Sequence, residues 1–474
     1  MARTLIRGGF VASQDPEYGD QPDTDVLIED GGIVAVGKNL DVGDAEITDA
    51  TNCIVLPGFV DGHRHIWQGP LRGVCADWSI MDYASRIRMN AARHFTPEDM
   101  YAAQLQGGLE ALNAGVTTVT DYCHNLLTPD HAHEAIRGIS ESGLRTVWNY
   151  GFNYPPQQVP HFKSLEERLS FLEELATQYF SSKDQLVTLG VAPEELLFAG
   201  GIENLAQQIN AARAVGAHIF WHANMPGETP PREVATLHDA NLLGSDITFV
   251  HMAGTEPDEW KLLADHGASV AFTPDTELQM GMGCPSSHIA RRYGVNQVYG
   301  TDIVSNNSAD MFTALRVGLQ GVRAHVLETD GPMHSGVPIT CSEVLKWGTI
   351  DAARALGLDS VVGSISPGKR ADIVLLRADT LTLAGWDRSN VASAIVLHAQ
   401  SADVDSVWVN GKIVKRDGEL LADTKLACGL LQAASERLHD RIAKHGGFAL
   451  NDEEAMRRVM AVAGSEHGEY DFNS

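Results

Sequence analysis

The stretch Pro57-Gly58-Phe59-Val60-Asp61-Gly62-His63-Arg64-His65 decides how the chain is organised. It continues the apolar run 53–56, and a short apolar run that ends in Pro-Gly is typical of a buried strand. Side chains two positions apart on a strand face the same side, so we expect His63 and His65 to project together from the strand end. Two imidazoles placed in this way could share a metal ion, although a His-x-His pair alone is a weak signal.

Downstream of this stretch, strand-like runs alternate with amphipathic stretches such as 97–113 and 165–179. The alternation indicates βα units and a parallel sheet. Eight strand-like runs can be counted, at 54–59, 116–120, 144–150, 186–191, 217–221, 247–250, 268–272 and 298–300. The sequence therefore predicts an α/β fold with a (β/α)8 TIM barrel over residues 57–360. A doubly wound open sheet is the competing fold, but no Gly-x-Gly-x-x-Gly motif follows the first run.

Short β-like runs gather at both ends of the chain. The N-terminal runs include a hairpin signal at 30–32, and the C-terminal runs include a second one at Asn410-Gly411. We therefore predict one composite β-sandwich domain, formed by residues 1–56 and 361–416 together. Residues 417–474 are expected to form a helix, at 426–444, and an acidic tail.

Composition and charge narrow the class of protein. The chain has 474 residues, 44% of them hydrophobic, and a formal net charge of −27, which argues against nucleic acid and anionic membranes as partners. Six cysteines without a Cys-x-x-Cys pair are typical of reduced thiols in the cytosol. No secretory signal is visible, and no apolar run approaches the roughly 18 residues of a membrane span. These features predict a cytoplasmic protein with a small-molecule substrate.

Polar side chains follow most of the predicted barrel strands. Barrel enzymes do their chemistry at the C-terminal strand ends, where this sequence places His63, His65, Asp121, His124, Asn153, Glu194, Glu195, His222, His251, Thr273, Asp275 and Asp302. Three imidazoles and a carboxylate, from His63, His65, His222 and Asp302, suit Zn²⁺, with Fe²⁺ and Mn²⁺ as alternatives. Such a metal lowers the pKa of a bound water to about 7, which predicts metal-assisted hydrolysis. Asp302 is the expected general base, and His251 is expected to orient the hydroxide or stabilise the adduct.

These motifs resemble those of the amidohydrolase superfamily, in particular its cytosine-deaminase-like branch, which includes the triazine hydrolases. The matching positions cover roughly residues 1–416 and comprise 57–65, 71–73, 115–118, His222, His251, 300–302, 305–312 and 363–374. The resemblance implies a distorted barrel with a composite β-sandwich and a homodimer or larger assembly. It also implies one metal, held by His63, His65, His222 and Asp302. The lysine nearest the fourth strand end, Lys183, precedes that strand, which argues against the two-metal subtype with a carboxylated lysine.

One departure from the family pattern concerns the proton shuttle. Deaminases of this branch usually carry His-x-x-Glu after the fifth strand, whereas this chain has His222-Ala223-Asn224-Met225. A thioether cannot move a proton. Either the leaving group departs without being protonated by this residue, or another carboxylate delivers the proton. The candidates are Glu194, Glu195, Asp275 and Glu277. For each of them, an exposed charge on a loop is the simpler interpretation.

Several residues are predicted to contact a flat heteroaromatic substrate. Gln68, Trp67 and Trp78 follow the metal motif directly, although core packing of the two tryptophans is an equally good interpretation. Glu194, Glu195, Asn224 and Glu277 complete the predicted substrate-binding set. The Met-rich segment 278–283 is either an adaptable pocket wall or a plain loop.

Three functions are compatible with this pattern. The first is hydrolytic deamination or deamidation at a C–N bond of a small N-heterocycle. The second keeps the metal but cleaves an amide, urea or carbamate, or removes chlorine, because such substrates could dispense with the missing glutamate. The third is a catalytically silent binding homologue, against which the complete set of predicted metal ligands argues.

Overall fold

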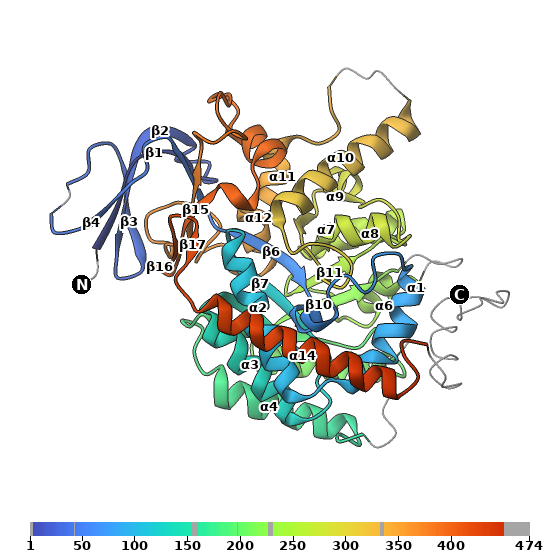
Figure 1. Cartoon of the computed structure of the whole chain (residues 1–474). Coiled ribbons are helices and arrows are strands. Elements are labelled where there is room, and N and C mark those ends of the chain that lie inside the picture. Colours follow the sequence, from blue (N-terminus) through green and yellow to red (C-terminus); the bar gives the residue numbers. More distant parts are fainter. Residues whose placement is uncertain are drawn as a thin grey trace.

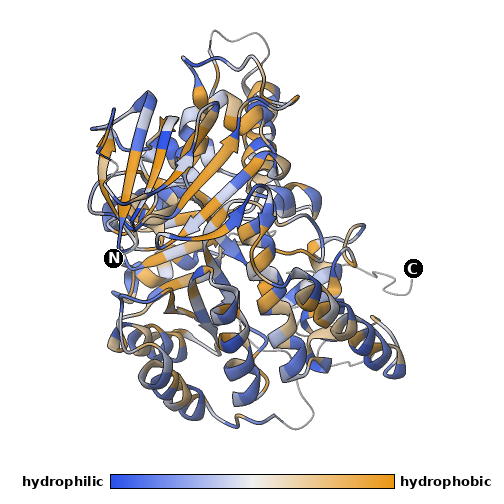
Figure 2. Cartoon of the chain, turned by 60° about the vertical axis from the view of Figure 1, so that its left-hand side comes forward, coloured by the Kyte–Doolittle hydropathy of each residue, from blue (hydrophilic) through white to orange (hydrophobic). Residues whose placement is uncertain are grey.

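The computed structural model describes residues 3–41, 43–152, 160–196, 198–225, 231–331 and 336–449 (Figure 1). Its strands form two separate sheets, one of nine strands built from both chain ends and one of eight parallel strands built from the middle. Figure 2 shows hydrophobic residues concentrated on the strands of both sheets. Within the described residues, no helix combines the length and the apolar content needed to cross a membrane.

The eight-stranded sheet is the predicted barrel. Its strands follow one another in sequence order as β6 (Phe59–Arg64), β7 (Val116–Cys123), β8 (Arg145–Gly151), β9 (Val187–Ala192), β10 (His218–Ala223), β11 (Ile247–His251), β12 (Ser269–Phe272) and β13 (Asn296–Tyr299). Just beyond β13, the Asp302 N–H donates to the His63 carbonyl and the His65 N–H donates to the Asp302 carbonyl, each at 2.8 Å. These two bonds link the last strand end to the first, so the eight-stranded parallel barrel is confirmed.

Helices surround the barrel (Figure 1); most occupy the connections between its strands, and the last three follow its last strand. They are α2 (Pro97–Asn113), α3 (Pro129–Ser142), α4 (Leu165–Tyr179), α5 (Ile202–Ala214), α6 (Glu233–Asp239), α7 (Pro257–His266), α8 (Pro274–Gln279), α9 (Ser287–Tyr293), α10 (Met311–Asp330), α11 (Cys341–Trp347) and α12 (Ile350–Ala355). The helices predicted at 97–113 and 165–179 coincide with α2 and α4. Capping signals fix these starts: Thr96 and Asp99 form a capping box at α2, and Ser164 caps α4.

The connection after β6 is built from short helical pieces. They are the 3-10 segment η1 (Ile66–Leu71), α1 (Ile80–Tyr83), the π-type segment η2 (Ala84–Arg88) and the 3-10 segment η3 (Ala91–His94). Near the C-terminus, α13 (Val391–Ser393), η4 (Ala394–His398) and η5 (Ser401–Asp403) link two strands of the other sheet.

The nine-stranded sheet joins the two ends of the chain. Its members are β1 (Arg3–Ala12), β2 (Asp20–Glu29), β3 (Gly32–Gly37), β4 (Glu46–Asp49), β5 (Cys53–Pro57), β14 (Ile373–Arg377), β15 (Val404–Val409), β16 (Lys412–Arg416) and β17 (Glu419–Leu420). β5 lies between β1 and β14, parallel to the first and antiparallel to the second. Both predicted hairpins are present, as β2–β3 and β15–β16. The composite β domain is thus confirmed, while its boundaries at 56/57 and 360/361 stay a prediction.

The prediction of 54–59 as the first barrel strand is wrong. The apolar run forms β5 in the nine-stranded sheet, and the barrel begins one strand later, with β6. The chain passes from one sheet to the other at Gly58, where a Cβ atom would lie only 2.1 Å from Thr117 Oγ1. Two buried strands separated by a single glycine read as one apolar run in the sequence. As a result, His63 lies within β6, and His65 directly follows it.

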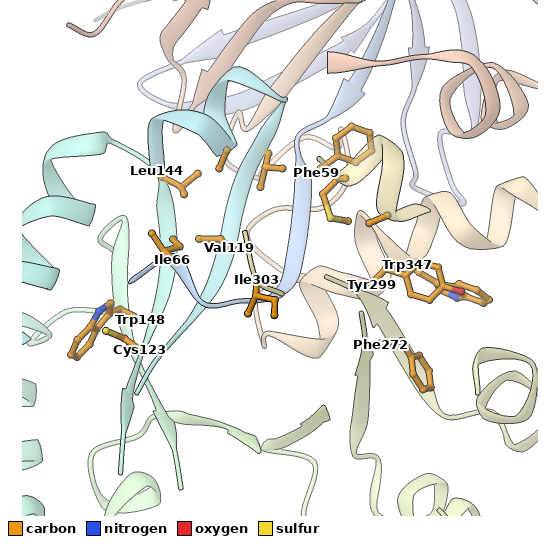
Figure 3. Close-up of a cluster of buried hydrophobic side chains, with 14 of the residues drawn as sticks. Phe59, Ile66, Val119, Cys123, Leu144, Trp148, Phe272, Tyr299, Ile303 and Trp347 are labelled. Carbon is orange, nitrogen blue, oxygen red and sulfur yellow. The ribbon is translucent and has the colours of Figure 1, made fainter. Parts of the chain in front are cut away.

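Two layers of buried side chains flank the barrel strands. Inward-facing residues fill the lumen, where Val60, Val147, Phe220 and Val250 pack with Ala352 of α12. Outward-facing residues pack beneath the helices, and Figure 3 shows part of this second cluster, with Val119 and Leu144 on one side of β6 and Tyr299 and Trp347 on the other. Since the lumen is filled by apolar side chains, the polar chemistry is confined to the strand ends.

Helix α14 (Thr424–Lys444) crosses the outside of the barrel (Figure 1) and extends the helix predicted at 426–444 by two residues. Its Ser435 hydroxyl donates to the Pro70 carbonyl of η1 at 2.7 Å. Arg441 donates to the His94 carbonyl at 2.8 Å and pairs with Asp99 of α2. The predicted acidic tail, with Glu466, Glu469 and Asp471, lies outside the described residues.

A buried ion pair joins the barrel to the nine-stranded sheet. The Arg145 guanidinium donates to both carboxylate oxygens of Asp372, at 2.8 and 2.9 Å, and the two side chains are 8% and 1% exposed. Arg145→Leu is expected to lower the free energy of unfolding by roughly 3–5 kcal/mol, because it leaves a buried carboxylate without its cation. Urea denaturation measures this loss. The double variant Arg145→Leu/Asp372→Asn should lose less stability than the single variant, and an equal loss would contradict the assignment.

Candidate metal centre

The four predicted metal ligands meet at the C-terminal ends of three barrel strands. β6 supplies His63 and is followed by His65, β10 supplies His222, and Asp302 follows β13. The Nε2 atom of His63 lies 3.1 Å from Nε2 of His65 and 3.2 Å from Nε2 of His222. Oδ1 of Asp302 lies 3.4 Å from the His63 nitrogen and 3.5 Å from that of His65. Residues more than 200 positions apart in the sequence are thereby brought to one point.

The second ring nitrogens fix the tautomers of two of these histidines. Nδ1 of His65 lies 2.8 Å from the Tyr122 carbonyl, which can only accept, so this nitrogen carries the proton. Nδ1 of His222 lies 3.0 Å from Oε1 of Glu195, whose pKa burial raises to about 7, and it donates to the ionised form of that carboxyl. Both Nε2 atoms therefore present lone pairs to His63. Such hydrogen-bond partners orient metal-binding histidines and strengthen the electron-pair donation of the other ring nitrogen to a metal.

A cation fits this arrangement. Burial lowers the pKa of His63, His65 and His222 well below the ordinary histidine value, and neighbouring imidazoles add to the effect, so the rings are neutral. The Nε2 atoms of His65 and His222 both face Nε2 of His63, at 3.1 and 3.2 Å, while Nδ1 of His63 is buried without a hydrogen-bond partner among the described residues. With metal–nitrogen distances of about 2.0–2.1 Å, tetrahedral ligands lie roughly 3.3 Å apart. The distances from His63 Nε2 to the other three ligand atoms, 3.1 to 3.4 Å, are close to that value.

His251 lies beside this set at the end of β11. Its ring centroid is 5.6 Å from that of His63 and 5.3 Å from that of His222, and one of its nitrogens comes within 4.8 Å of their ligand atoms. Its Nδ1 faces Oε1 of Glu277 at 3.3 Å. Burial opposes protonation of this ring, but the hydrogen bond with Glu277 and the charge of Asp302 outweigh it and raise the His251 pKa.

The backbone is strained at these strand ends. His251 and Asp302 adopt φ values of +75° and +60°, in a region that residues other than glycine rarely occupy. Strain of this kind persists where surrounding contacts over-determine the conformation, and it clusters at functional sites. Gly300 lets β13 approach β6 closely, since a Cβ there would lie 2.5 Å from the backbone nitrogen of His63.

Gln68 and Trp67, predicted to bind substrate, are both fully buried. The Gln68 amide donates to the Tyr83 hydroxyl at 2.7 Å and accepts from the Ser305 hydroxyl at 2.6 Å. Trp67 packs on Phe95, with ring centroids 5.1 Å apart. Its indole N–H donates to Nδ1 of His124 at 3.1 Å. For Trp67, these contacts favour the core-packing interpretation.

The remaining predicted substrate contacts divide into two groups. Trp78 is half-buried against Phe448, and the Glu194 carboxylate accepts from Gln208 of α5 at 3.0 Å. The amide of Asn224 is engaged by Glu233, Thr255 and Glu259, which favours a structural role over the predicted contact with substrate. Glu195 and Glu277 are the two that touch the centre, through His222 and His251 respectively. Asp275 lies on α8, where burial raises its pKa to about 6.

Of three further side chains around the centre, the sequence singled out His124 but neither Tyr122 nor Arg88. The Tyr122 ring stacks on His222 with centroids 4.1 Å apart, and His124 stacks on His65 at 4.4 Å. Arg88 is a buried guanidinium at the end of η2, with its Cζ 5.8 Å from the Trp67 ring. Arg88 carries no strand-end signal, because it belongs to the long connection after β6. Lys183 is exposed ahead of β9, and Asn153 lies outside the described residues.

The Amidohydrolase family model matches residues 54–414 of the chain. The 5-methylthioadenosine/S-adenosylhomocysteine deaminase of Pyrococcus furiosus is 28% identical over 435 residues, which cover 88% of this chain and 96% of that protein. The 5'-deoxyadenosine deaminase of Methanosarcina barkeri is 25% identical over 452 residues, which cover 93% of this chain and 100% of that protein.

Solved structures share the fold. An adenosine deaminase from Xanthomonas campestris with bound zinc has a TM-score of 0.81 at 23% identity, over 93% of this chain and 99% of that one. A variant of atrazine chlorohydrolase from Arthrobacter aurescens, complexed with zinc and atraton, has a TM-score of 0.78 at 19% identity, over 91% of this chain and 100% of that one. At these identities the likeness establishes the barrel architecture alone.

Proposed function

The chain belongs to the amidohydrolase family, and from this premise we propose that it hydrolyses a C–N bond of a small N-heterocycle and releases ammonia or an amine. The observation that carries the proposal is the convergence of three imidazole nitrogens and one carboxylate oxygen at the barrel's strand ends, from His63, His65, His222 and Asp302. The relatives support deamination in particular, since both are named deaminases. A cytoplasmic location and a homodimeric or larger assembly stay predictions.

The centre is proposed to hold one divalent ion. Its donor set fits Zn²⁺ best, with Fe²⁺ and Mn²⁺ as alternatives, and zinc is present in the two structural neighbours. When bound, such an ion lowers the pKa of water to about 7 and supplies a hydroxide nucleophile at neutral pH.

Groups of the protein itself are proposed to transfer the proton, stabilise charge and orient the histidines. Asp302 is proposed to accept the proton of the attacking water, because its carboxylate lies beside the ligand nitrogens, where a general base is needed. His251 is proposed to stabilise the charge that develops on the substrate as the nucleophile adds. The Tyr122 carbonyl and Glu195 hold His65 and His222 in the tautomers described above.

A panel of aminoheterocycles tests the proposed activity. Ammonia release would be followed for the metal-loaded protein with purine, pyrimidine, pterin and triazine compounds that carry an exocyclic amine. Turnover of at least one class is expected, and a variant with both His63 and His65 replaced by alanine is the background control. Absence of turnover across the panel with stoichiometric metal would count against deamination. It would favour the second candidate function, hydrolysis of an amide, urea or carbamate or removal of chlorine.

The second candidate function is supported by Met225. It stands three residues after His222, and its thioether cannot carry a proton to a leaving amine. Met225→Glu is expected to raise kcat for ammonia release by about tenfold, well below the 10²–10⁴-fold that an optimally placed acid–base group provides. Met225→Gln has the same length without an acid and is the matched control. If the two variants behave alike, proton delivery does not pass through position 225, and the second candidate gains support.

A further inference from the structure

One hydroxyl connects the two halves of the candidate centre. Thr273 Oγ1 lies 3.3 Å from Oδ2 of Asp302 and 3.2 Å from Nδ1 of His251. The same oxygen is 3.5 Å from Oε1 of Glu277, which lies 3.3 Å from the His251 nitrogen. All four side chains are buried. Asp302 and His251 come from different strand ends, and Thr273 touches both.

We propose that Thr273 and Glu277 are positioning residues that couple Asp302 to His251. The inference rests on the proposed function for the catalytic meaning of that coupling, whereas the coupling itself concerns side-chain geometry alone. Neither residue is expected to bond to the substrate.

Local structure places these two groups where the coupling needs them. Thr273 directly precedes α8, which begins with Pro274, so the Thr273 N–H has no partner within the helix. Oε1 of Glu277, in the first turn, accepts this N–H at 2.8 Å. This helix-start hydrogen bond turns the Glu277 carboxylate back over the Thr273 side chain and toward His251.

One arrangement of protons satisfies the contacts of Thr273 with Asp302 and His251 and the contact of Glu277 with His251. The Thr273 hydroxyl donates its single proton to Oδ2 of Asp302, the nearer of its two carboxylate neighbours. The Thr273 oxygen and the Glu277 carboxylate are then both acceptors facing the His251 Nδ1–H. With that proton on Nδ1, the other nitrogen of His251 lies on the side of His63 and His222. The other carboxylate oxygen of Asp302, Oδ1, faces the ring nitrogens of His63 and His65.

The backbone explains why such restraints are needed. Asp302 and His251 both hold positive φ angles, so each residue would relax if its side chain were released. Loss of the outer partners of a metal site typically costs 10–100-fold in metal affinity or activity. Thr273 restrains both Asp302 and His251, so removal of its hydroxyl should affect the positions of both side chains.

Substitution of the hydroxyl tests the coupling. Thr273→Val keeps the side-chain shape and is expected to weaken Zn²⁺ affinity about tenfold in chelator competition and to change the visible spectrum of the Co²⁺-loaded protein. It should also lower kcat by about 10–100-fold with KM changed less than threefold. Thr273→Ser should restore all three readouts. The matched control is Thr276→Val, because Thr276 is equally buried on α8 but donates to Asn307 at 3.2 Å; it should leave affinity and spectrum unchanged.

A double-mutant cycle distinguishes coupling from separate effects. Glu277→Gln is expected to lower kcat by about tenfold, and the Thr273→Val/Glu277→Gln variant should lose less than the product of the two single effects. Additive losses, or a Thr273→Val protein with native Zn²⁺ affinity and Co²⁺ spectrum, would overturn the proposal. The metal readouts need no substrate. A wild-type protein inactive on the heterocycle panel would therefore refute the proposed function while the coupling is still decided by Thr273→Val.

Discussion

Asp302→Asn is expected to lower kcat by about 10³-fold or more. The asparagine amide keeps the shape of the side chain but cannot accept a proton, so the general-base contribution, worth about 10²–10⁴-fold, is lost. The negative charge opposite His63 and His65 disappears as well, which weakens metal binding. Steady-state kinetics and metal analysis of the purified variant measure the two effects separately.

Asp310→Asn is the matched control for Asp302→Asn. Asp310 lies on the same connection after β13, but its carboxylate accepts the Phe312 N–H at 3.0 Å at the start of α10. Asparagine caps helices about as well as aspartate, so stability and turnover should both be retained. An Asp302→Asn protein with more than a tenth of the native kcat would remove Asp302 from the proposed chemistry.

Removal of the metal by a chelator is expected to abolish turnover completely, and readdition of Zn²⁺ should restore it. The Nε2 atoms of His65 and His222 lie 3.1 and 3.2 Å from that of His63, and a bound cation would hold the three side chains together. The apo protein should therefore also unfold at a lower temperature. A ligand present at 100 times its Kd stabilises the folded state by about 2.7 kcal/mol. Calorimetric scans of the apo and reloaded protein measure the difference in Tm.

The same preparation separates an enzyme from a silent homologue. The proposed function requires close to one equivalent of metal per chain after purification, and activity should follow metal occupancy as the protein is reloaded. Activity that survives exhaustive chelation would contradict the mechanism. Stoichiometric metal without any turnover would favour the binding homologue.

Much of the candidate centre could be predicted from the sequence because barrel geometry is repetitive. Each strand of a parallel barrel ends on the same face, so a histidine or carboxylate after a strand-like run is assigned to one site without knowledge of the path between strands. This reasoning predicts His222 and Asp302 as ligands, and the structure brings them beside His63. The one wrong strand, at 54–59, left this set intact because β6 follows β5 directly.

The sequence pattern does not predict which of the polar side chains after the strands point toward the centre. Asn224 and Glu277 both follow strands and are both polar, yet one is engaged by Glu233, Thr255 and Glu259 while the other faces His251. Helix-start geometry and buried hydrogen bonds make that difference, and both depend on neighbours from other parts of the chain.

By itself, the sequence determined the alternating βα architecture, the composite β domain and the residue types gathered at the strand ends, since these follow from local periodicity and from the symmetry of a parallel barrel. Only the tertiary structure decided which ring nitrogens carry protons, which carboxylates stand behind which histidines, and that Thr273 links Asp302 to His251. Those features depend on contacts at hydrogen-bond distance between segments that are remote in the sequence. No pattern along the chain encodes such contacts.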